Sequence, residues 1–338
     1  MELGASPNER DYEGWTPLHY ARHHGKQDTF FALLEHGTEE ERQRRLVRAL
    51  HLAAATGDTA LATRLLDSGV AVDAADETGA TALFQVATGG ECFRRADPAL
   101  HEVVRLLLAR GADVGVRVQG RSALHHAAWR GDTQIVRLLR EAGARIELID
   151  AARIGDTQTV RHLLDVGENA NTRDPDGETA LLGAAERGYA ETVCLLLERG
   201  ADVSLRSDAW GDSPLRVAVS GRHTSVAALL VRHGAAVDER DDAGETALMA
   251  AARDNQAQIV HLLLVSGADV NALNNYGYSA LMQAAEKGAL DAVRVLLAAG
   301  AHVNQENIHQ GSAMGYAVHN GHEEVADLLR AAGAKENA

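Results

Sequence analysis

Cysteine is nearly absent from this chain of 338 residues, which holds only Cys92 and Cys194. The two lie far apart in the sequence, so they do not have the paired spacing of a metal site or of a disulfide framework. Proteins of oxidising compartments commonly use disulfides, whereas proteins of reducing compartments rarely do. The cysteine content therefore predicts a reducing compartment.

Long apolar runs and an excess of basic residues are lacking as well. No run approaches the ~18 residues that a membrane span needs, and the start, MELGASPNERDYEG, has no apolar stretch typical of a signal peptide. The net charge is −15 at pH 7 with a pI of about 5.5, whereas neutralising nucleic-acid phosphates needs clustered Lys and Arg. The sequence predicts a cytoplasmic protein that binds neither membranes nor nucleic acid.

Aromatic residues are scarce, at 4%, although hydrophobic residues make up 46% of the chain. Small and aliphatic side chains must therefore build the core, and 32 glycines interrupt them. Glycines that close aliphatic runs such as LLERG and LLAAG recur at nearly constant intervals. They are Gly37, Gly69, Gly111, Gly143, Gly167, Gly200, Gly234, Gly267, Gly300 and Gly333, and all but two of the intervals are 32 to 34 residues.

A second repeated feature is the segment TPLHYA at Thr16–Ala21, which follows a glycine-containing turn. Altered copies of it stand in GRSALHHAA, GETALLGAA and GYSALMQAA. A period of 33 residues that carries T-P-L-H-x-A resembles the ankyrin repeat, and the resemblance covers essentially the whole chain. It implies an all-α ankyrin-repeat solenoid of ten helix-turn-helix pairs joined by extended, β-hairpin-like turns.

The resemblance also implies structural roles for several polar residues. His19 and His125, with His51 at the matching place, would bridge a turn to a helix by hydrogen bonds. Asn271 and Asn304 would stabilise turns. Aspartates that open turns, where their side chains bond to the backbone, would be Asp11, Asp76, Asp174, Asp208 and Asp241.

Each repeat can be derived physically, as the segment from Gly277 onward shows. Ser279 offers a side-chain oxygen to cap a helix, on which Leu281 and Ala284 share one face. Gly300 suits the left-handed conformation that ends the second helix. A single pair of helices cannot bury its apolar stripe alone, but stacked pairs can.

Three departures from the period divide the chain. An insertion near residues 89–100 separates the two helices of the third repeat, and a charged, helix-prone stretch replaces the second repeat's turn. The interval of 24 residues between Gly143 and Gly167 lacks a turn altogether. We expect two sub-arrays: residues 1–146 with four irregular repeats, and residues 147–338 with six regular repeats and a C-terminal cap. One continuous stack with a notch is an equally open alternative.

Catalytic and metal-binding motifs are not found. Of sixteen histidines, His19 and His23 or His319 and His322 have suggestive spacings, but neither pair has further ligands at a recognised distance. The sequence contains no nucleophile elbow, P-loop or dinucleotide-binding fingerprint. We predict no enzyme activity, no cofactor and no metal.

The predicted binding surface is the concave face, formed by turn tips and first helices, through which proteins of this family bind partners. Acidic residues dominate the variable turn positions, and Trp is enriched in interface hot spots. The main predicted contact patch, in the second sub-array, comprises Trp210, Asp212, Asp242, Glu245, Tyr276 and Tyr278. A competing patch in the first comprises Tyr12, Trp15, Tyr20 and Trp129.

The sequence thus predicts a monomeric, non-catalytic scaffold or adaptor that binds a partner protein with a basic surface. An inhibitor or regulatory subunit of an enzyme is an alternative form of this function. An enzyme with a cryptic site would need a deep pocket with converging titratable groups, and a nucleic-acid binder would need a basic stripe.

Overall fold

The computed structural model describes residues 11–12, 20–21, 32, 38–89, 97–208 and 211–335. Trp15, His19, His23, Cys92 and Trp210 lie outside these ranges. Contacts between Cα atoms divide the chain into two compact units, Met1–Ile146 and Glu147–Ala338, which we call the N-terminal and the C-terminal unit.

The N-terminal unit consists, within its described residues, of three helix pairs. The first helix of each pair packs on the first helix of the next, and the second helices do the same. An antiparallel hairpin with two residues in each strand precedes the last pair. The elements are α3 (Glu39–Ala55), α4 (Thr59–Asp67), α5 (Ala82–Thr88), α6 (Pro98–Ala109), β1 (Arg117–Val118), β2 (Arg121–Ser122), α7 (Ala123–Arg130) and α8 (Thr133–Glu141).

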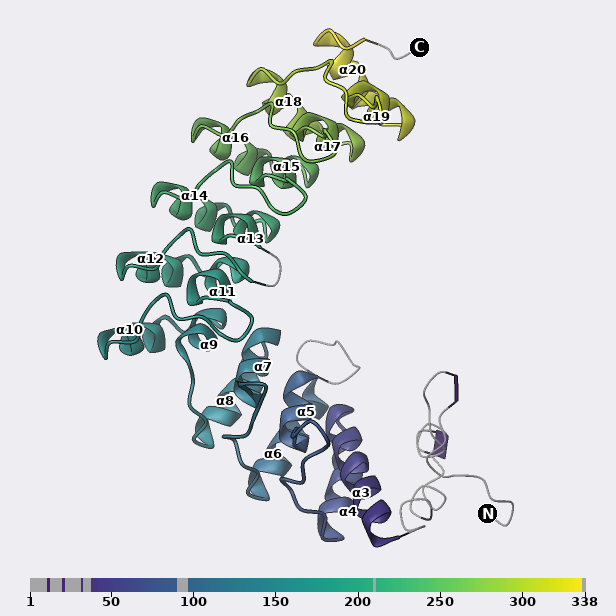
Figure 1. Ribbon diagram of the computed structural model, residues 1–338, viewed down its shortest axis with the longest axis vertical. Helices are drawn as coiled ribbons and strands as arrows, with labels where there is room; N and C mark the ends of the chain where they lie inside the picture. The colour runs from purple at the N-terminus through teal and green to yellow at the C-terminus, as the bar shows by residue number, and fades with distance from the viewer. Residues whose placement is uncertain are drawn as a thin grey trace. The chain divides into compact units, whose positions relative to one another are not determined.

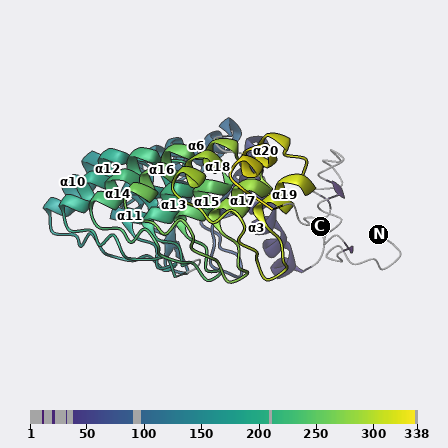
Figure 2. The same cartoon turned by 90° about the horizontal axis from the view of Figure 1, so that it is seen from above.

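The C-terminal unit consists of six helix pairs in two layers (Figure 1). The layer of first helices contains α9 (Leu148–Arg153), α11 (Ala180–Arg187), α13 (Pro214–Ser220), α15 (Ala247–Arg253), α17 (Ala280–Glu286) and α19 (Ala313–His319). The layer of second helices contains α10 (Thr157–Asp165), α12 (Ala190–Glu198), α14 (Thr224–Arg232), α16 (Ala257–Val265), α18 (Leu290–Ala298) and α20 (Glu323–Ala331). Figure 2 shows the extended turns projecting beside the layer of first helices.

The first helices begin where the sequence analysis expects them. The Ser279 Oγ accepts the Met282 N–H at 3.2 Å, and Thr81, Ser122, Thr179 and Thr246 cap their helices in the same way. Gly300 has the expected left-handed backbone, with φ 86°. Each cap satisfies an N–H group that the first turn of a helix leaves unpaired.

The core lies between the two layers and between successive pairs. Leu181, Leu215, Leu248 and Leu281 occupy equivalent positions and are each about 1% exposed. Alanines on the same helices, such as Ala284 and Ala285, are fully buried. Burying one Leu side chain is worth about 2 kcal/mol, so every added pair stabilises the pair before it.

Asparagines after the second helices tie each pair to the next. Asn271 donates from Nδ2 to the Gly300 carbonyl at 3.5 Å and accepts the His302 N–H at 2.7 Å. Asn304 does the same with Gly333 and Lys335, at 3.1 and 2.8 Å. The predicted turn-stabilising role of both asparagines is confirmed.

The irregular parts of the N-terminal unit also match the sequence in their main features. The charged stretch forms α3, and Thr38, which caps the helix, makes a reciprocal capping box with Glu41. The insertion falls between α5 and α6, and its residues 90–96 lie outside the described ones. His51 bridges α3 to the following turn, because its Nε2 lies 2.9 Å from the Ala74 carbonyl oxygen.

The prediction that Asp208 opens a turn is wrong. Asp76, Asp174 and Asp241 open their turns as expected, but in the turn at 207–212 it is Ser207, not Asp208, whose N–H closes the turn, on the Asp212 carbonyl. The Asp208 carboxylate instead accepts from Arg173 Nη1 at 2.9 Å.

We expect His51 to make the N-terminal unit less stable in mild acid. Burial lowers the pKa of His51, so the unfolded chain binds its proton more readily than the folded chain. The contribution of the neutral His51 side chain to stability is complete above its pKa of about 6.5 in the unfolded chain. This contribution is lost as the pH falls through the pKa of His51 in the folded chain. The urea midpoint should drop between about pH 7.5 and pH 5, and drop less in His51→Asn. The exposed His261→Asn is the matched control; an equal effect of both substitutions would contradict this assignment.

We also expect Arg45→Met to stabilise the protein. Arg45 is 5% exposed in α3, and its three guanidinium nitrogens have no hydrogen-bond partner in the structure as described. A buried, uncompensated charge costs several kcal/mol, and an apolar residue of similar volume removes that cost. The thermal midpoint of Arg45→Met should therefore rise, whereas Arg44→Met, at an exposed position of the same helix, should leave it nearly unchanged. A lower midpoint for Arg45→Met would disprove this account.

Candidate functional site

Four extended turns of the C-terminal unit share one internal hydrogen-bond pattern. The Asn274 Oδ1 accepts the N–H groups of Tyr276 and Tyr278, both at 2.9 Å. Asp174, Asp241 and Asn307 accept the equivalent two N–H groups in their own turns. Each turn is therefore ordered by one side chain at its base, which presents the intervening residues at the tip.

Arginines join consecutive turns to one another. Arg173 Nη1 donates to the Gly177 carbonyl of its own turn at 2.8 Å and to the Arg206 carbonyl of the next at 2.9 Å. Arg206 bonds to the Gly211 and Arg240 carbonyls at 2.6 and 3.1 Å, and Arg240 bonds to those of Gly244 and Leu273. Sequence analysis missed this series, although an arginine at one position of three consecutive repeats was a visible signal.

Two of the predicted acidic contact residues lie at the base of the turns and have partners within the chain. The Asp212 carboxylate accepts from Arg216 Nε at 2.9 Å. The Glu245 Oε1 accepts from Asn274 Nδ2 and Gln283 Nε2, both at 2.6 Å. Asp242, at a turn tip, is exposed. The acidic surface is thus smaller than the sequence suggests, because an arginine and two side-chain amides already donate hydrogen bonds to the carboxylates below the tips.

Tyr278 is held in a stack with Tyr316 of the next helix pair. The ring centroids are 5.4 Å apart, and the two hydroxyl oxygens are 2.7 Å apart. Asn307 Nδ2 donates to the Tyr316 hydroxyl at 2.7 Å. The hydrogen bond to Tyr316, with some burial, raises the pKa of Tyr278 to about 12. Tyr316 was not among the predicted site residues, since only stacking brings it to Tyr278.

Tyr276 and Ile308 form an exposed apolar pair at adjacent turn tips. Tyr276 is 55% exposed and Ile308 63%, and the Ile308 N–H donates to the Tyr276 carbonyl at 3.2 Å. Gly277 allows this approach: its φ is 77°, and a Cβ there would lie 3.1 Å from the Asn307 Cα and the Ile308 nitrogen. Large exposed side chains on an ordered backbone are suited to contact a partner.

The competing patch lies in the N-terminal unit. Tyr12 is 96% exposed, Tyr20 43% and Trp129, near the end of α7, 54%. The structure describes neither Trp15 here nor Trp210 in the main patch, so the placement of both tryptophans stays a prediction.

Histidines of the C-terminal unit act as links between helix pairs. His322 Nε2 lies 3.0 Å from the Glu286 carbonyl oxygen, and His223 Nε2 lies 3.0 Å from that of Glu186. Among the described residues, no group of three or more His, Cys, Asp or Glu side chains is arranged to hold a metal ion. Nor is any helix in the described ranges both long and apolar enough to cross a membrane.

We expect Tyr316→Phe to lower the pKa of Tyr278 from about 12 toward its usual value. The Tyr316 hydroxyl, which this substitution removes, is the main cause of the raised pKa of Tyr278. Losing its hydrogen bond should cost about 1 kcal/mol of stability. Because the folded pKa lies above the unfolded one, this stabilisation is present below the unfolded pKa and lost as the pH rises through the folded value. Phenolate absorbance during alkaline titration measures the shift. Tyr276→Phe is the control, and an unchanged titration of Tyr316→Phe would contradict the assignment.

Comparison with known proteins identifies the family. A model of ankyrin repeats in three copies matches residues 50–150, 148–241, 206–274, 230–307 and 248–338, and a model of the single ankyrin repeat matches residues 13–41. Together they cover most of the chain, which confirms the fold that the T-P-L-H segments and the period of 33 residues predict. The count of ten repeats stays a prediction.

Two relatives share only part of their length with the chain. The B-cell lymphoma 3 protein homolog of Mus musculus is 33% identical over 151 residues, which are 43% of this chain and 32% of that protein. The E3 ubiquitin-protein ligase KEG of Arabidopsis thaliana is 28% identical over 200 residues, 53% of this chain but 12% of the ligase. A crystal structure of an ankyrin repeat domain from Acinetobacter baumannii AYE superimposes with a TM-score of 0.53 at 32% identity, covering 56% of this chain and 98% of that domain. The chain belongs to the ankyrin-repeat family.

Proposed function

We propose that this protein is a non-catalytic scaffold or adaptor that binds a partner protein through the turn tips and first helices of its C-terminal unit. Ankyrin repeats generally mediate protein–protein interaction, and the single observation that carries the proposal is the exposed pair of Tyr276 and Ile308. Both side chains stand on turns whose backbones are already ordered.

Pre-ordering matters because binding must offset the entropy lost when an interface becomes rigid. Arg173, Arg206 and Arg240 join the turns from residue 173 to residue 273, and the backbone bond from Ile308 to Tyr276 extends the series. A partner would therefore meet a preformed surface and lose little of its binding free energy in ordering it.

The expected partner presents an apolar patch with basic residues around it. Tyr276 and Ile308 supply the apolar area, and Asp242, exposed on a neighbouring turn, supplies negative charge. The net charge of −15 would steer a basic surface toward the protein and make the association rate sensitive to salt. Trp210, which the sequence analysis assigns to the same patch, would extend it.

Ligase activity is not carried over from the plant relative, because the similarity covers 12% of that protein. A regulatory or inhibitory subunit would use the same surface as an adaptor. The cytoplasmic location rests on the scarcity of cysteine. Like the monomeric state, it stays a prediction.

The test requires a partner, obtained by co-purification from the native host and identified by mass spectrometry. Tyr276→Ser combined with Ile308→Ser should then weaken binding at least about tenfold, since removing apolar anchors from an interface centre commonly costs 1.4 kcal/mol or more. Isothermal titration calorimetry measures the affinity, and far-UV circular dichroism checks that the helices remain.

Val166→Ser combined with Val265→Ser is the matched control, because these residues are 64% and 66% exposed outside the turns. Normal binding by the Tyr276/Ile308 variant would remove the proposed site. If Trp15→Ala or Trp129→Ala abolished binding instead, the contact would belong to the N-terminal unit.

A further inference from the structure

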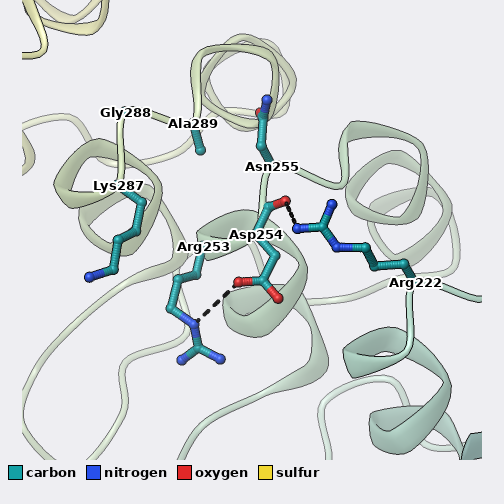
Figure 3. Close-up of a pocket in the computed structure, with 7 residues that line it drawn as sticks. All are labelled: Arg222, Arg253, Asp254, Asn255, Lys287, Gly288 and Ala289. Carbon is teal, nitrogen blue, oxygen red and sulfur yellow. Dashed lines mark hydrogen bonds and ion pairs between the residues drawn. The ribbon is translucent and has the colours of Figure 1, made fainter. Parts of the chain in front are cut away.

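An open pocket lies at the other end of the first helices from the turn tips (Figure 3). It spans three consecutive helix pairs of the C-terminal unit, where α13, α15 and α17 lead into α14, α16 and α18. Its lining residues are Arg222, Arg253, Asp254, Asn255, Lys287, Gly288 and Ala289. Three of them are cationic, which is unusual in a chain with a net charge of −15.

The carboxylates around the pocket leave its cations able to bind another anion. Arg253 lies 3.6 Å from a Glu245 oxygen and 3.7 Å from an Asp254 oxygen, and both distances are too long for hydrogen bonds. Lys287 pairs with its half-buried neighbour Glu286 at 3.1 Å, and ion pairs near the surface are weak. The side chains of Arg253 and Lys287 are 42% and 53% exposed.

Arg222 is the third cation of the pocket, and its backbone conformation is one that glycine adopts more readily than arginine. Its φ is 61°, in the left-handed region, and the equivalent positions of neighbouring pairs are Gly188 and Gly288. An arginine there is disfavoured relative to glycine. Its guanidinium donates to the Asp254 carbonyl oxygen at 3.2 Å, at the edge of the pocket (Figure 3). Strained residues of this kind persist where the surroundings hold them, and they concentrate at functional sites.

The next pair also departs from glycine at this position, but for a structural reason. Asn255 has φ 54°, and its Oδ1 accepts the Ala292 N–H of the following pair at 3.0 Å. Asparagine tolerates the left-handed region well. Asn255 therefore fixes the pocket wall, whereas Arg222 adds a cation.

We propose that this pocket binds a carboxylate side chain, from a Glu or Asp on an extended segment of a protein partner. A guanidinium matches a carboxylate with two parallel hydrogen bonds, and a nearby ammonium adds charge. The pocket is open, which suits a side chain on a peptide better than an enclosed small molecule. The site is separate from the turn tips, so it does not depend on the function proposed for them.

The test uses ¹⁵N-labelled full-length protein and three probes at equal ionic strength: a capped tetraglutamate peptide, a capped tetraglutamine peptide and inorganic phosphate. Tetraglutamate should shift the amide signals of residues 253–255 and 287–289 saturably, and tetraglutamine should not. Arg253→Gln with Lys287→Gln should weaken binding at least about tenfold, as expected on losing charge-assisted hydrogen bonds. Arg294→Gln, at an exposed position of α18, is the control.

The Arg222→Gly variant distinguishes an effect on binding from an effect on folding. It removes the cation and relieves the left-handed strain, so affinity for tetraglutamate should fall while the thermal midpoint does not. An unchanged affinity, or an equal loss in Arg294→Gln, would overturn the proposal. Phosphate binding as tightly as tetraglutamate, with the same shifts, would assign the pocket to free phosphate and overturn the carboxylate partner. These outcomes leave the turn-tip site unaffected.

Discussion

No helix pair of this protein can bury its own apolar surface, and the rest of the structure follows from that constraint. Leu215 and Leu281 are about 1% exposed because a neighbouring pair covers each of them. Val318 shows the converse. It is equivalent to the buried Ala285, but within the described residues no further helix pair follows α19 and α20, and Val318 is 59% exposed. Stability is therefore built from contacts between neighbours.

The same constraint positions the candidate site. Stacking the helices at a constant spacing brings consecutive turns close enough for a single arginine to reach two of them, as Arg173 and Arg206 do. Four of the turns are ordered internally by an Asp or Asn at the base, which fixes carbonyls that the arginines bind. The ordered core in this way fixes the positions of the turn tips, which present Tyr276 and Ile308.

Two departures from the pattern of the repeats lie in the proposed carboxylate pocket. Local preference, packing and capping agree along most of the C-terminal unit, as they do in sequences that specify one structure. The agreement fails at Arg222, a left-handed residue where glycine is preferred. Arg253 is also unusual, because it has two carboxylates near it and a hydrogen bond to neither. Both residues line the same pocket.

The sequence by itself determined the family, the helix cap at Ser279 and the roles of His51, Asn271 and Asn304, because the period and its repeated motifs mark these positions. Ser279 and Gly300 could be interpreted from their neighbours alone. Only the tertiary structure decided which polar residues are free at the surface. Glu245 seemed an exposed turn residue, but Gln283, 38 positions further along, holds it. Tyr278 likewise meets Tyr316 from the next pair. Such partners come together only when the helix pairs stack, and the pattern within one repeat does not specify them.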